Sequence, residues 1–556
     1  MKFYFSETLL FEDCYGIHFT QDHIGTNYRG PWDDFGHIIT FKMFFFSDTA
    51  PFKKNSIGNI KILYRDGENT SSFFKSKGKK VKDKIFDITD ILNIKVLVSI
   101  GEDINFYKKI KSVFNDDLIV NSVLEKICDA SRSIENNEYY SKWDGYSGSF
   151  MRGSSSNAIL KNGYAIACGN YVRDSVFDLN LNDIGVEFEP VTFRFNAKRE
   201  VGGGGNICLL IGKNGVGKTH ILKNLSELIA GVRNPDENNP LPCFNKIIIV
   251  AYSPFENFYT EKEIFIKLQE RYSDKDSKPN NKSFERKRLH VNEYSYIGFR
   301  SEKGVFDIKN PDVQSAKSIF NIIKYDYSNI WWHNESKFEL VEKTLKLSID
   351  FDYISLTSKS GEDILLSKDG YNSREILRKE IDYEKGVAFK KNERIVPLSS
   401  GQKIYAYMIP SIISEIEDES LLVVDEPELY LHPELEVGLI SMIKYILANT
   451  ESFAIIATHS SILAREIKKD SITILRKNCN ITKSYPPSIE TYGESIDAIT
   501  SEVFDDEYIT KPYQKEIDSL LSRGVKVSKI SRNVGNDALT YMLSKDSNDD
   551  ITVEDE

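Results

Sequence analysis

The feature that most constrains this chain is a glycine-rich loop at residues 212–219, GKNGVGKT. An apolar run at 207–211 leads into the loop, and residues 220–225 leave it with the spacing of a helix. Small residues let consecutive backbone N–H groups converge on phosphate oxygens at the positive end of such a helix, while the lysine adds charge and the threonine binds Mg²⁺. This context argues against a chance turn. We therefore predict that ATP is bound by Gly212, Lys213, Asn214, Gly215, Val216, Gly217, Lys218 and Thr219.

Length and composition limit the alternatives. A chain of 556 residues is too long for one ordinary core, so we expect two or three domains. The formal net charge of -11 argues against a protein that coats nucleic acid through its overall field. The six cysteines are scattered without a CxxC pair, which indicates reduced thiols. No secretory signal begins the sequence and no uncharged apolar run approaches the ~18 residues of a membrane helix, so we expect a cytoplasmic protein with no membrane contact.

Changes of pattern along the chain predict five regions. Strand-like runs at 37–46 and 57–64, followed by helical spacing from 103 to 134, indicate an α+β beginning. Residues 260–395 are charged and weakly periodic, which favours helices. The first predicted region is an N-terminal α+β region at 1–185 that partly completes the antiparallel β portion of the core. The nucleotide-binding core follows in two halves, at 186–265 and 396–505, with a mostly helical insertion or lid between them at 266–395. C-terminal helices with an acidic tail are predicted at 506–556.

A second apolar strand, at residues 420–424, ends in the adjacent carboxylates Asp425 and Glu426. A buried strand that ends in this way delivers acids to the metal beside a phosphate-binding loop. We expect Asp425 to support Mg²⁺ and Glu426 to orient the water that attacks the γ-phosphate. An Asp-Glu strand end is common by chance, but this one lies between two further motifs.

Residues 398–402, LSSGQ, resemble the LSGGQ signature of the ABC ATPase superfamily, with serine in place of the first glycine. The resemblance implies that Ser399, Ser400, Gly401 and Gln402 cap an ATP molecule held by the loop of a second subunit. It therefore implies a homodimer that encloses ATP and Mg²⁺ between two chains. A larger oligomer is an alternative that the resemblance does not decide. Taken alone, Ser-Ser-Gly is also an ordinary helix N-cap.

The stretch at 425–433, DEPELYLHP, is similar to ATPases related to RecF, SMC and OLD proteins and differs from the D-loop of transporter subunits. An apolar strand at 453–457 then leads to His459, which matches the switch histidine of that group, a donor to the γ-phosphate. The resemblance thus implies Lys218, Glu426 and His459 as catalytic residues. In the ATPases that the sequence resembles, a strand like the one at 246–252 is followed by a glutamine that senses Mg²⁺ and water. Here Ser253 stands in that place as a candidate substitute, so we expect slow hydrolysis.

Segments outside these motifs resemble the ATPase subunit (PtuA) of bacterial Septu systems, which also accompanies some retrons. They include DFGH at 34–37, VSIGED at 98–103, SFMR at 149–152 and TYGES at 491–495. The resemblance covers most of the chain. It implies a role in defence against phages, with a separate HNH nuclease (PtuB-like) as partner and, in retrons, a reverse transcriptase with its RNA–DNA product.

We expect no nuclease activity on this chain itself. About 180 residues separate Lys218 from the signature, which is far too few for a long SMC arm. The 97 residues after His459 contain acids at 505–507, but these lack the apolar strand that presents acids to metal in the Toprim domain of OLD nucleases. The eight histidines are dispersed and form no HNH pattern.

Two basic runs are candidate nucleic-acid contacts, and each has the simpler alternative of a solvated loop. One holds Lys79, Lys80 and Lys82, and the other, in the insertion, holds Arg286, Lys287 and Arg288. Phe73, Phe74 and Phe284 lie beside them, and bases stack on such rings.

The sequence therefore predicts an α/β fold, an ABC-type ATPase head with a P-loop RecA-like sheet and an antiparallel β portion, plus a helical insertion and an N-terminal α+β region. The predicted function is an ATP-hydrolysing defence subunit that regulates an HNH nuclease through ATP-dependent dimerisation. Two alternatives stay open. One is a RecF-like DNA-repair ATPase with DNA-stimulated hydrolysis, and the other is a nucleotide-gated scaffold with little hydrolysis. The D-loop and the large N-terminal region argue against a transporter subunit.

Overall fold

The structure is a computed structural model. It describes residues 1–26, 29–34, 36–48, 54–151, 154–198, 204–233, 241–242, 244–272, 294–332, 336–367, 372–504, 511–523, 525, 530 and 533–549. The chain divides into two compact units, Met1–Gly493 and Glu494–Glu556. Within the described ranges, no helix is both long and apolar enough to cross a membrane.

Within the first unit, residues 3–167 are called the N-terminal domain. It is built on a seven-stranded sheet with the order β5-β6-β1-β2-β3-β4-β7. Only the β1–β2 pair within it is parallel. The strands are β1 (Phe3–Ser6), β2 (Gly16–Gln21), β3 (Thr40–Phe46), β4 (Lys54–Tyr64), β5 (Lys79–Lys82), β6 (Ile85–Asp87) and β7 (Leu97–Gly101). Strands β3 and β4 coincide with the two apolar runs that predicted strands, and Phe41, Met43 and Ile60 from them are fully buried in one core.

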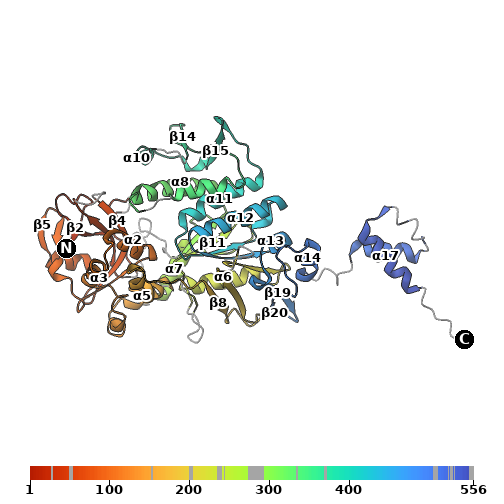
Figure 1. The fold of residues 1–556 in the computed structure, drawn as a ribbon, viewed down its shortest axis with the longest axis horizontal. Helices are drawn as coiled ribbons and strands as arrows, with labels where there is room; N and C mark the ends of the chain where they lie inside the picture. The colour runs from red at the N-terminus through yellow and green to blue at the C-terminus, as the bar shows by residue number, and fades with distance from the viewer. Residues whose placement is uncertain are drawn as a thin grey trace. The chain divides into compact units, whose positions relative to one another are not determined.

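Helices of the N-terminal domain pack around this sheet, in the red and orange part of Figure 1. They are α1 (Thr70–Lys77), α2 (Ile104–Phe114), α3 (Asp117–Lys126), α4 (Asn137–Tyr140) and α5 (Ser154–Ala167), with the short turns η1 (Thr89–Ile91), η2 (Ile134–Asn136) and η3 (Tyr146–Phe150). Asp103 begins α2 by accepting a hydrogen bond from the backbone N–H of Phe106 at 2.7 Å, and Asn115 ends it in the left-handed conformation. Helix α2 contacts β4 and α5.

The central sheet of the first unit has the order β12-β11-β17-β18-β10-β19-β20. Its strands are β10 (Ile207–Gly212), β11 (Ile247–Ala251), β12 (Tyr294–Gly298), β17 (Leu421–Asp425), β18 (Phe453–Thr458), β19 (Ile472–Asn478) and β20 (Ile481–Tyr485). All neighbours are parallel except β19 and β20. The inner strands are continuous apolar runs because both faces of the sheet are covered. This sheet confirms the predicted mixed α/β fold of a P-loop ATPase.

Register places the motifs at one edge of this sheet. Strand β18 lies between β10 and β17, with Ile456 opposite both Leu209 and Val424. Parallel strands end at the same edge, and a ligand in such a sheet binds there. The loop after β10, the acids at the end of β17 and the histidine after β18 therefore meet.

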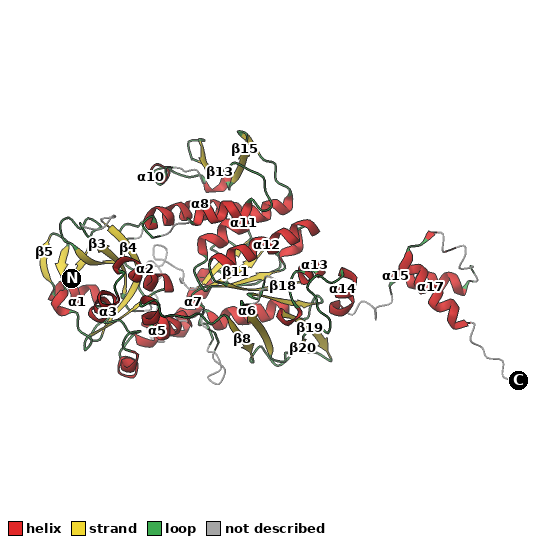
Figure 2. Cartoon of the chain, viewed as in Figure 1, coloured by secondary structure: helices red, strands yellow, loops and turns green. Residues whose placement is uncertain are grey.

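Helices cover the two faces of the central sheet (Figures 1 and 2). Helix α6 (Lys218–Ile229) contacts β10, β11, β17 and β18 from one face. Helix α11 (Ser400–Glu415) contacts β11 and β12 and packs on α8 (Asn310–Asn329), α9 (Lys337–Leu345) and α12 (Pro433–Asn449). The remaining elements are the hairpin of β8 (Val176–Leu181) and β9 (Val191–Asn196), α7 (Glu261–Tyr272), η6 (Pro427–Tyr430), α13 (Ser461–Arg465) and η7 (Lys469–Ser471).

The insertion contains more strand than the sequence analysis expected. Besides α7, α8 and α9 it supplies β12 to the central sheet, and it also holds a four-stranded antiparallel sheet. That sheet has the order β14-β13-β15-β16 and consists of β13 (Tyr353–Thr357), β14 (Asp363–Leu366), β15 (Ala388–Lys391) and β16 (Arg394–Ile395), near α10 (Ser373–Ile376) and η5 (Tyr383–Lys385). The strands are only two to five residues long, so they produce only a weak period-2 signal.

The second unit is described by itself. It contains α14 (Ile496–Phe504), α15 (Pro512–Ser522) and α17 (Asn536–Asp549), and Ile517, Ile530 and Met542 form its small core. Helices α15 and α17 lie in the region, 506–556, where the sequence analysis expected C-terminal helices. Helix α17 includes the first acids of the predicted tail, and residues 550–556 lie outside the described residues.

Candidate nucleotide-binding site

The glycine-rich loop turns sharply between β10 and α6. Gly215 and Gly217 have φ angles of 79° and 98°, a backbone region that side chains other than glycine rarely adopt. A Cβ on Gly217 would also lie 2.5 Å from the Phe188 ring. The glycines therefore permit a backbone turn at the start of α6, where anions bind.

Three ionisable side chains converge beside this loop. Lys218 Nζ donates a hydrogen bond to the Gly212 carbonyl at 3.1 Å and lies 2.6 Å from His459 Nε2. It also lies 3.7 Å from Glu426 Oε1. Burial lowers the pKa of the Lys218 ammonium, and the nearby carboxylates act in the opposite direction. The structure thus brings together all three residues that the sequence assigned to catalysis.

Asp425 and Thr219 form the candidate metal site. The Thr219 hydroxyl donates to Asp425 Oδ2 at 2.8 Å, while Asp425 Oδ1 is buried with no hydrogen-bond partner. Burial raises the pKa of Asp425 to about 7, and a divalent cation would favour its ionised form. No group of three or more His, Cys, Asp or Glu side chains in the described residues could hold a metal alone. The pair instead fits Mg²⁺, which commonly takes one or two protein oxygens and completes its shell with phosphate and water.

Glu426 is held in an unusual backbone conformation. Its φ of 47° lies in the left-handed region, which costs free energy for a residue other than glycine. Its backbone N–H donates to the Ala457 carbonyl at 2.9 Å, and its Oε1 lies 3.0 Å from His459 Nε2. The hydrogen bond with His459 lowers the pKa of Glu426, so this carboxylate is ionised and able to accept a hydrogen bond from water.

Glu428 belongs to the site, and the sequence analysis missed it. Its Oε1 accepts a hydrogen bond from the backbone N–H of His459 at 2.5 Å, and its Oε2 is buried with no hydrogen-bond partner. Burial raises the pKa of Glu428. The available signal was a third acid two residues after Glu426, on a turn that the preceding proline begins.

The signature-like segment begins α11. Ser399 caps the helix by accepting from the Gln402 backbone N–H at 3.3 Å, and Gln402 Oε1 accepts from the Ser399 N–H at 3.1 Å. Ser399 and Ser400 are exposed, while Gly401 is buried against α12. Among the described residues, no hydrogen bond joins these four residues to the loop at 212–219. The helix-cap interpretation is therefore correct for Ser399, and the hydroxyl of Ser400 is left at the surface.

Ser253 follows β11 at the same edge of the sheet. Strand β11 ends at Ala251, which pairs with Asp425. Ser253 is half-buried, and its hydroxyl accepts a hydrogen bond from the Phe255 N–H at 3.3 Å. Ser253 therefore lies two residues beyond the strand position that pairs with Asp425, and its role as a sensor stays a prediction.

The predicted basic surface at β5 is partly neutralised by acids. Lys80 pairs with Asp83 at 3.3 Å and Lys82 pairs with Glu12 at 2.8 Å. Lys79 and Lys80 are exposed on an edge strand, where lysine commonly prevents pairing with other chains. The solvated-surface interpretation fits this strand better than a nucleic-acid contact.

The aromatic neighbours of that strand are not available for stacking on bases. Phe74 is fully buried, and Phe73 stacks on Tyr64 with ring centroids 4.2 Å apart. The interpretation of Phe74 was wrong because its burial depends on strands distant in sequence, while half-buried Phe73 is occupied by its stacking on Tyr64. Arg286, Lys287, Arg288 and Phe284 lie outside the described residues.

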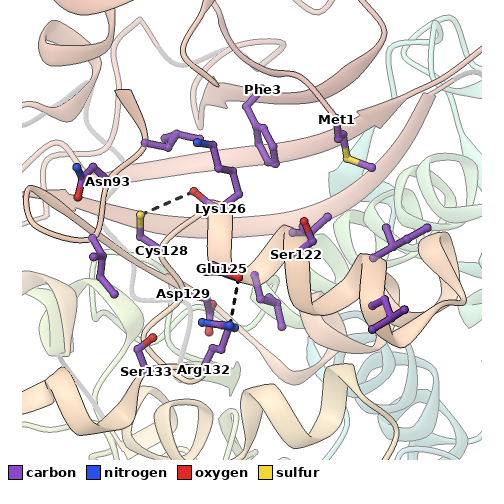
Figure 3. A pocket seen from close by; sticks show the side chains of 16 residues that line it. Met1, Phe3, Asn93, Ser122, Glu125, Lys126, Cys128, Asp129, Arg132 and Ser133 are labelled. Atoms are coloured by element: carbon purple, nitrogen blue, oxygen red, sulfur yellow. Dashed lines mark hydrogen bonds and ion pairs between the residues drawn. The ribbon is translucent and has the colours of Figure 1, made fainter. Parts of the chain in front are cut away.

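A separate pocket of about 780 Å³ lies in the N-terminal domain beside α3 (Figure 3). Phe3 and Met1 line one part, and Arg132 donates a hydrogen bond to Glu125 at 3.2 Å in another. Burial raises the pKa of the Cys128 thiol to about 12. No residue predicted from the sequence to bind nucleotide or catalyse its hydrolysis lines this pocket.

Comparisons with known proteins agree with the geometry of the site. Residues 207–465 match the family model described as "AAA domain, putative AbiEii toxin, Type IV TA system". This range contains the glycine-rich loop, both acids and His459. This range, a little under half of the chain, is therefore a P-loop domain that is similar to that family.

The chain is also similar to a curated protein in sequence and to solved structures in fold. Protein ea59 of Escherichia phage lambda is 24% identical over 554 residues, which cover 93% of this chain and 94% of ea59. The SMC head domain from Thermotoga maritima is 12% identical, with a TM-score of 0.28, over 57% of this chain and 100% of the head domain. An ATP-binding cassette of an ABC transporter in its ADP conformation is 15% identical, with a TM-score of 0.27, over 60% of this chain and 97% of the cassette.

Proposed function

We propose that this chain is an ATPase that binds ATP and Mg²⁺ and hydrolyses ATP within a two-fold dimer. The observation that carries the proposal is the convergence of Lys218, Glu426 and His459 beside the Thr219–Asp425 pair. These side chains come from α6 and from the ends of two neighbouring strands. They provide the positive charges, the metal-binding oxygens and the base that transfer of a phosphoryl group to water requires.

The chain's own residues account for each step of hydrolysis. Lys218 and the backbone N–H groups at the start of α6 bind the phosphates, and Thr219 with Asp425 holds Mg²⁺, which would neutralise charge on the phosphate oxygens. Glu426 orients water for in-line attack and accepts its proton. A bond forms between the water oxygen and the γ-phosphorus while the bond to the β–γ bridging oxygen breaks, which yields ADP and phosphate. His459 donates to the γ-phosphate oxygens.

The dimer is supported by the exposure of the signature-like segment. Ser400 is exposed at the positive end of α11 and has no hydrogen bond to its own chain's phosphate loop. Two copies related by a two-fold axis would each present Ser400 to the other's ATP, a self-complementary arrangement. Each site would then need both chains.

The defence role is the finer part of the proposal and is supported by the segments that resemble Septu ATPases. Two of these segments meet in the N-terminal domain, where buried Lys61 lies 3.2 Å from Asp34 Oδ2 and donates to the Ser149 carbonyl at 2.8 Å. We propose that a separate HNH nuclease, and in a retron setting a reverse transcriptase with its RNA–DNA product, associates with the dimer. The matched family model carries the description "putative AbiEii toxin, Type IV TA system".

A nucleotide-gated scaffold with little hydrolysis is the second candidate. It is favoured by Ser253, whose hydroxyl accepts a hydrogen bond from Phe255 in the same loop. A glutamine at this position would have a longer side chain that could reach Mg²⁺ and water. A measured turnover number separates the two functions, because a scaffold would bind ATP and release almost no phosphate.

The experiment that tests the ATPase compares the unmodified protein with Glu426→Gln. Phosphate release and molar mass in ATP and Mg²⁺ are measured for both. We expect the variant to bind ATP, to lose at least about 100-fold in turnover, and to accumulate as a dimer. Unchanged turnover in Glu426→Gln would refute the role of Glu426. Affinity purification from the native host, with mass spectrometry and sequencing of bound nucleic acid, tests the partners, and the absence of any HNH protein would contradict the defence assignment.

A further inference from the structure

Three loops at the nucleotide edge of the central sheet expose apolar side chains. They follow β11, β12 and β17, which are adjacent parallel strands and therefore end at the same edge as the phosphate loop. The exposed residues are Phe255, Val305, Phe306, Ile308, Leu429 and Tyr430, named here the edge patch. Phe255 is 93% exposed and Ile308 is 71% exposed. Packing among the residues that the structure describes does not cover these side chains.

Ring contacts link two members of the edge patch, Phe306 and Tyr430, through Phe299. Phe299 lies between Phe306 and Tyr430, with ring centroids 5.4 Å and 6.5 Å away. It also meets buried Tyr252, at 5.6 Å, which comes immediately after β11. The three loops are therefore joined through the ring of Phe299.

The hairpin that follows β12 is held in place by hydrogen bonds. The Ser301 N–H donates to the Val305 carbonyl at 2.9 Å, and the Asp307 N–H donates to the Phe299 carbonyl at 2.8 Å. Arg300 donates to Glu263 at 2.8 Å and to the Gly304 carbonyl at 2.9 Å. These hydrogen bonds hold the backbone that carries Val305 and Phe306 in one conformation. Less conformational entropy is therefore lost when a partner binds to their side chains.

The edge patch is continuous with the signature-like segment. The carbonyl of Tyr430 packs against Gly401, in the first turn of α11 that Ser399 caps. A two-fold dimer that brings Ser400 to the partner's ATP must also bring this neighbouring surface close to the partner. Six such side chains expose on the order of 500 Å², a large part of the roughly 800 Å² that each partner buries in a standard interface.

We propose that the edge patch is the apolar half of the interface with a second copy of this chain, beside the shared ATP. This inference rests on the proposed dimer and adds the loops at 253–256 and 299–308 to it. The polar contacts through ATP make association depend on nucleotide. The apolar contacts supply its strength, since buried apolar surface is the main favourable term in association.

The test uses the Glu426→Gln chain as parent, with Phe255→Asp or Ile308→Asp added. Leu118→Asp is the matched control, because Leu118 is 81% exposed on α3 of the N-terminal domain. Sedimentation in ATP and Mg²⁺ measures the dimer dissociation constant, and a fluorescent ATP analogue measures nucleotide binding. We expect Phe255→Asp and Ile308→Asp each to weaken the dimer at least tenfold while nucleotide affinity at low protein concentration stays within twofold, and Leu118→Asp to match the parent.

Two results would overturn the inference and are distinguishable. If both edge variants form the ATP dimer as tightly as the parent, the dimer stands and the edge patch is not part of it, which would leave a different protein as its occupant. If the parent binds ATP and stays monomeric, the proposed dimer itself fails, and this use of the patch fails with it.

Discussion

Lys108, on helix α2 of the N-terminal domain, donates a hydrogen bond of 2.6 Å to Asp418 in the loop between α11 and β17. That loop joins the helix that begins at Ser400 to the strand that ends at Asp425. Tyr171 reaches the same loop and donates to Glu419 at 3.1 Å. The N-terminal domain and Tyr171 are therefore linked by hydrogen bonds to the segment that connects helix α11 with the strand that ends at Asp425.

We predict that Lys108→Ala and Asp418→Ala are not additive. Both side chains are about one-third exposed, so a double-mutant cycle of unfolding free energies should give a coupling of about 0.5–1 kcal/mol. We also expect each variant to lower the turnover number without changing ATP affinity, because the loop loses an anchor while the phosphate loop is intact. Lys111→Ala, three residues further along α2, is the control. Strict additivity with normal turnover would contradict this coupling.

Lys218→Ala should remove nucleotide binding. The ammonium is buried beside Glu426 and is the side-chain cation predicted to contact the phosphates, so we expect at least a 100-fold loss of ATP affinity by titration calorimetry. Lys223→Ala, on the same helix, is the matched control, since Lys223 lies over the Tyr259 ring. Near-normal affinity in Lys218→Ala would mean that the loop binds another ligand.

Glu428 should act as a positioning residue for His459. Glu428→Ala removes the acceptor of the His459 backbone N–H, so the imidazole loses its fixed position and we expect turnover to fall about tenfold with little change in KM. Glu428→Gln keeps an acceptor oxygen and should retain most activity. If the Ala and Gln variants were equally impaired, the negative charge rather than the hydrogen bond would be what matters.

Much of the site could be predicted because its residues follow strands whose ends meet at one edge. Asp425 and Lys218 needed only the apolar runs before them and their motifs, whereas His459 came from its match to the switch histidine of the ATPases that the sequence resembles. Glu428 was missed because its partner is a backbone N–H thirty-one residues away. Burial of Phe74, which led to the wrong stacking interpretation, comes from contacts with Phe5 and Phe41 across the sheet. The β13–β16 sheet was missed because its strands are too short to show a period.

His18 should make the N-terminal domain sensitive to acid. Burial lowers the pKa of His18 to about 4, with Nε2–H donating to the Cys14 carbonyl at 2.6 Å and Nδ1 accepting from Ser6 at 2.8 Å. Between pH 6.5 and 4 the unfolded chain binds a proton that the folded chain does not, so stability falls as pH falls, by up to about 3 kcal/mol.

Denaturant unfolding at several pH values checks this prediction. His18→Gln cannot titrate in that range and should lose this part of the pH dependence, although it starts from lower stability. An unmodified protein and a His18→Gln variant with parallel stability profiles from pH 7 to 4 would show that His18 is not the cause.

Mixing two inactive variants tests whether each ATP is shared between two chains. Lys218→Ala lacks the phosphate-binding cation, and Ser400→Arg blocks the surface predicted to cap the partner's ATP, while Ser399 still caps α11. Each variant alone should be inactive in phosphate release. Mixed together, they should regain part of the activity, because the Lys218→Ala chain supplies an intact cap to the intact phosphate loop of the Ser400→Arg chain. A mixture as inactive as its components would contradict the shared site.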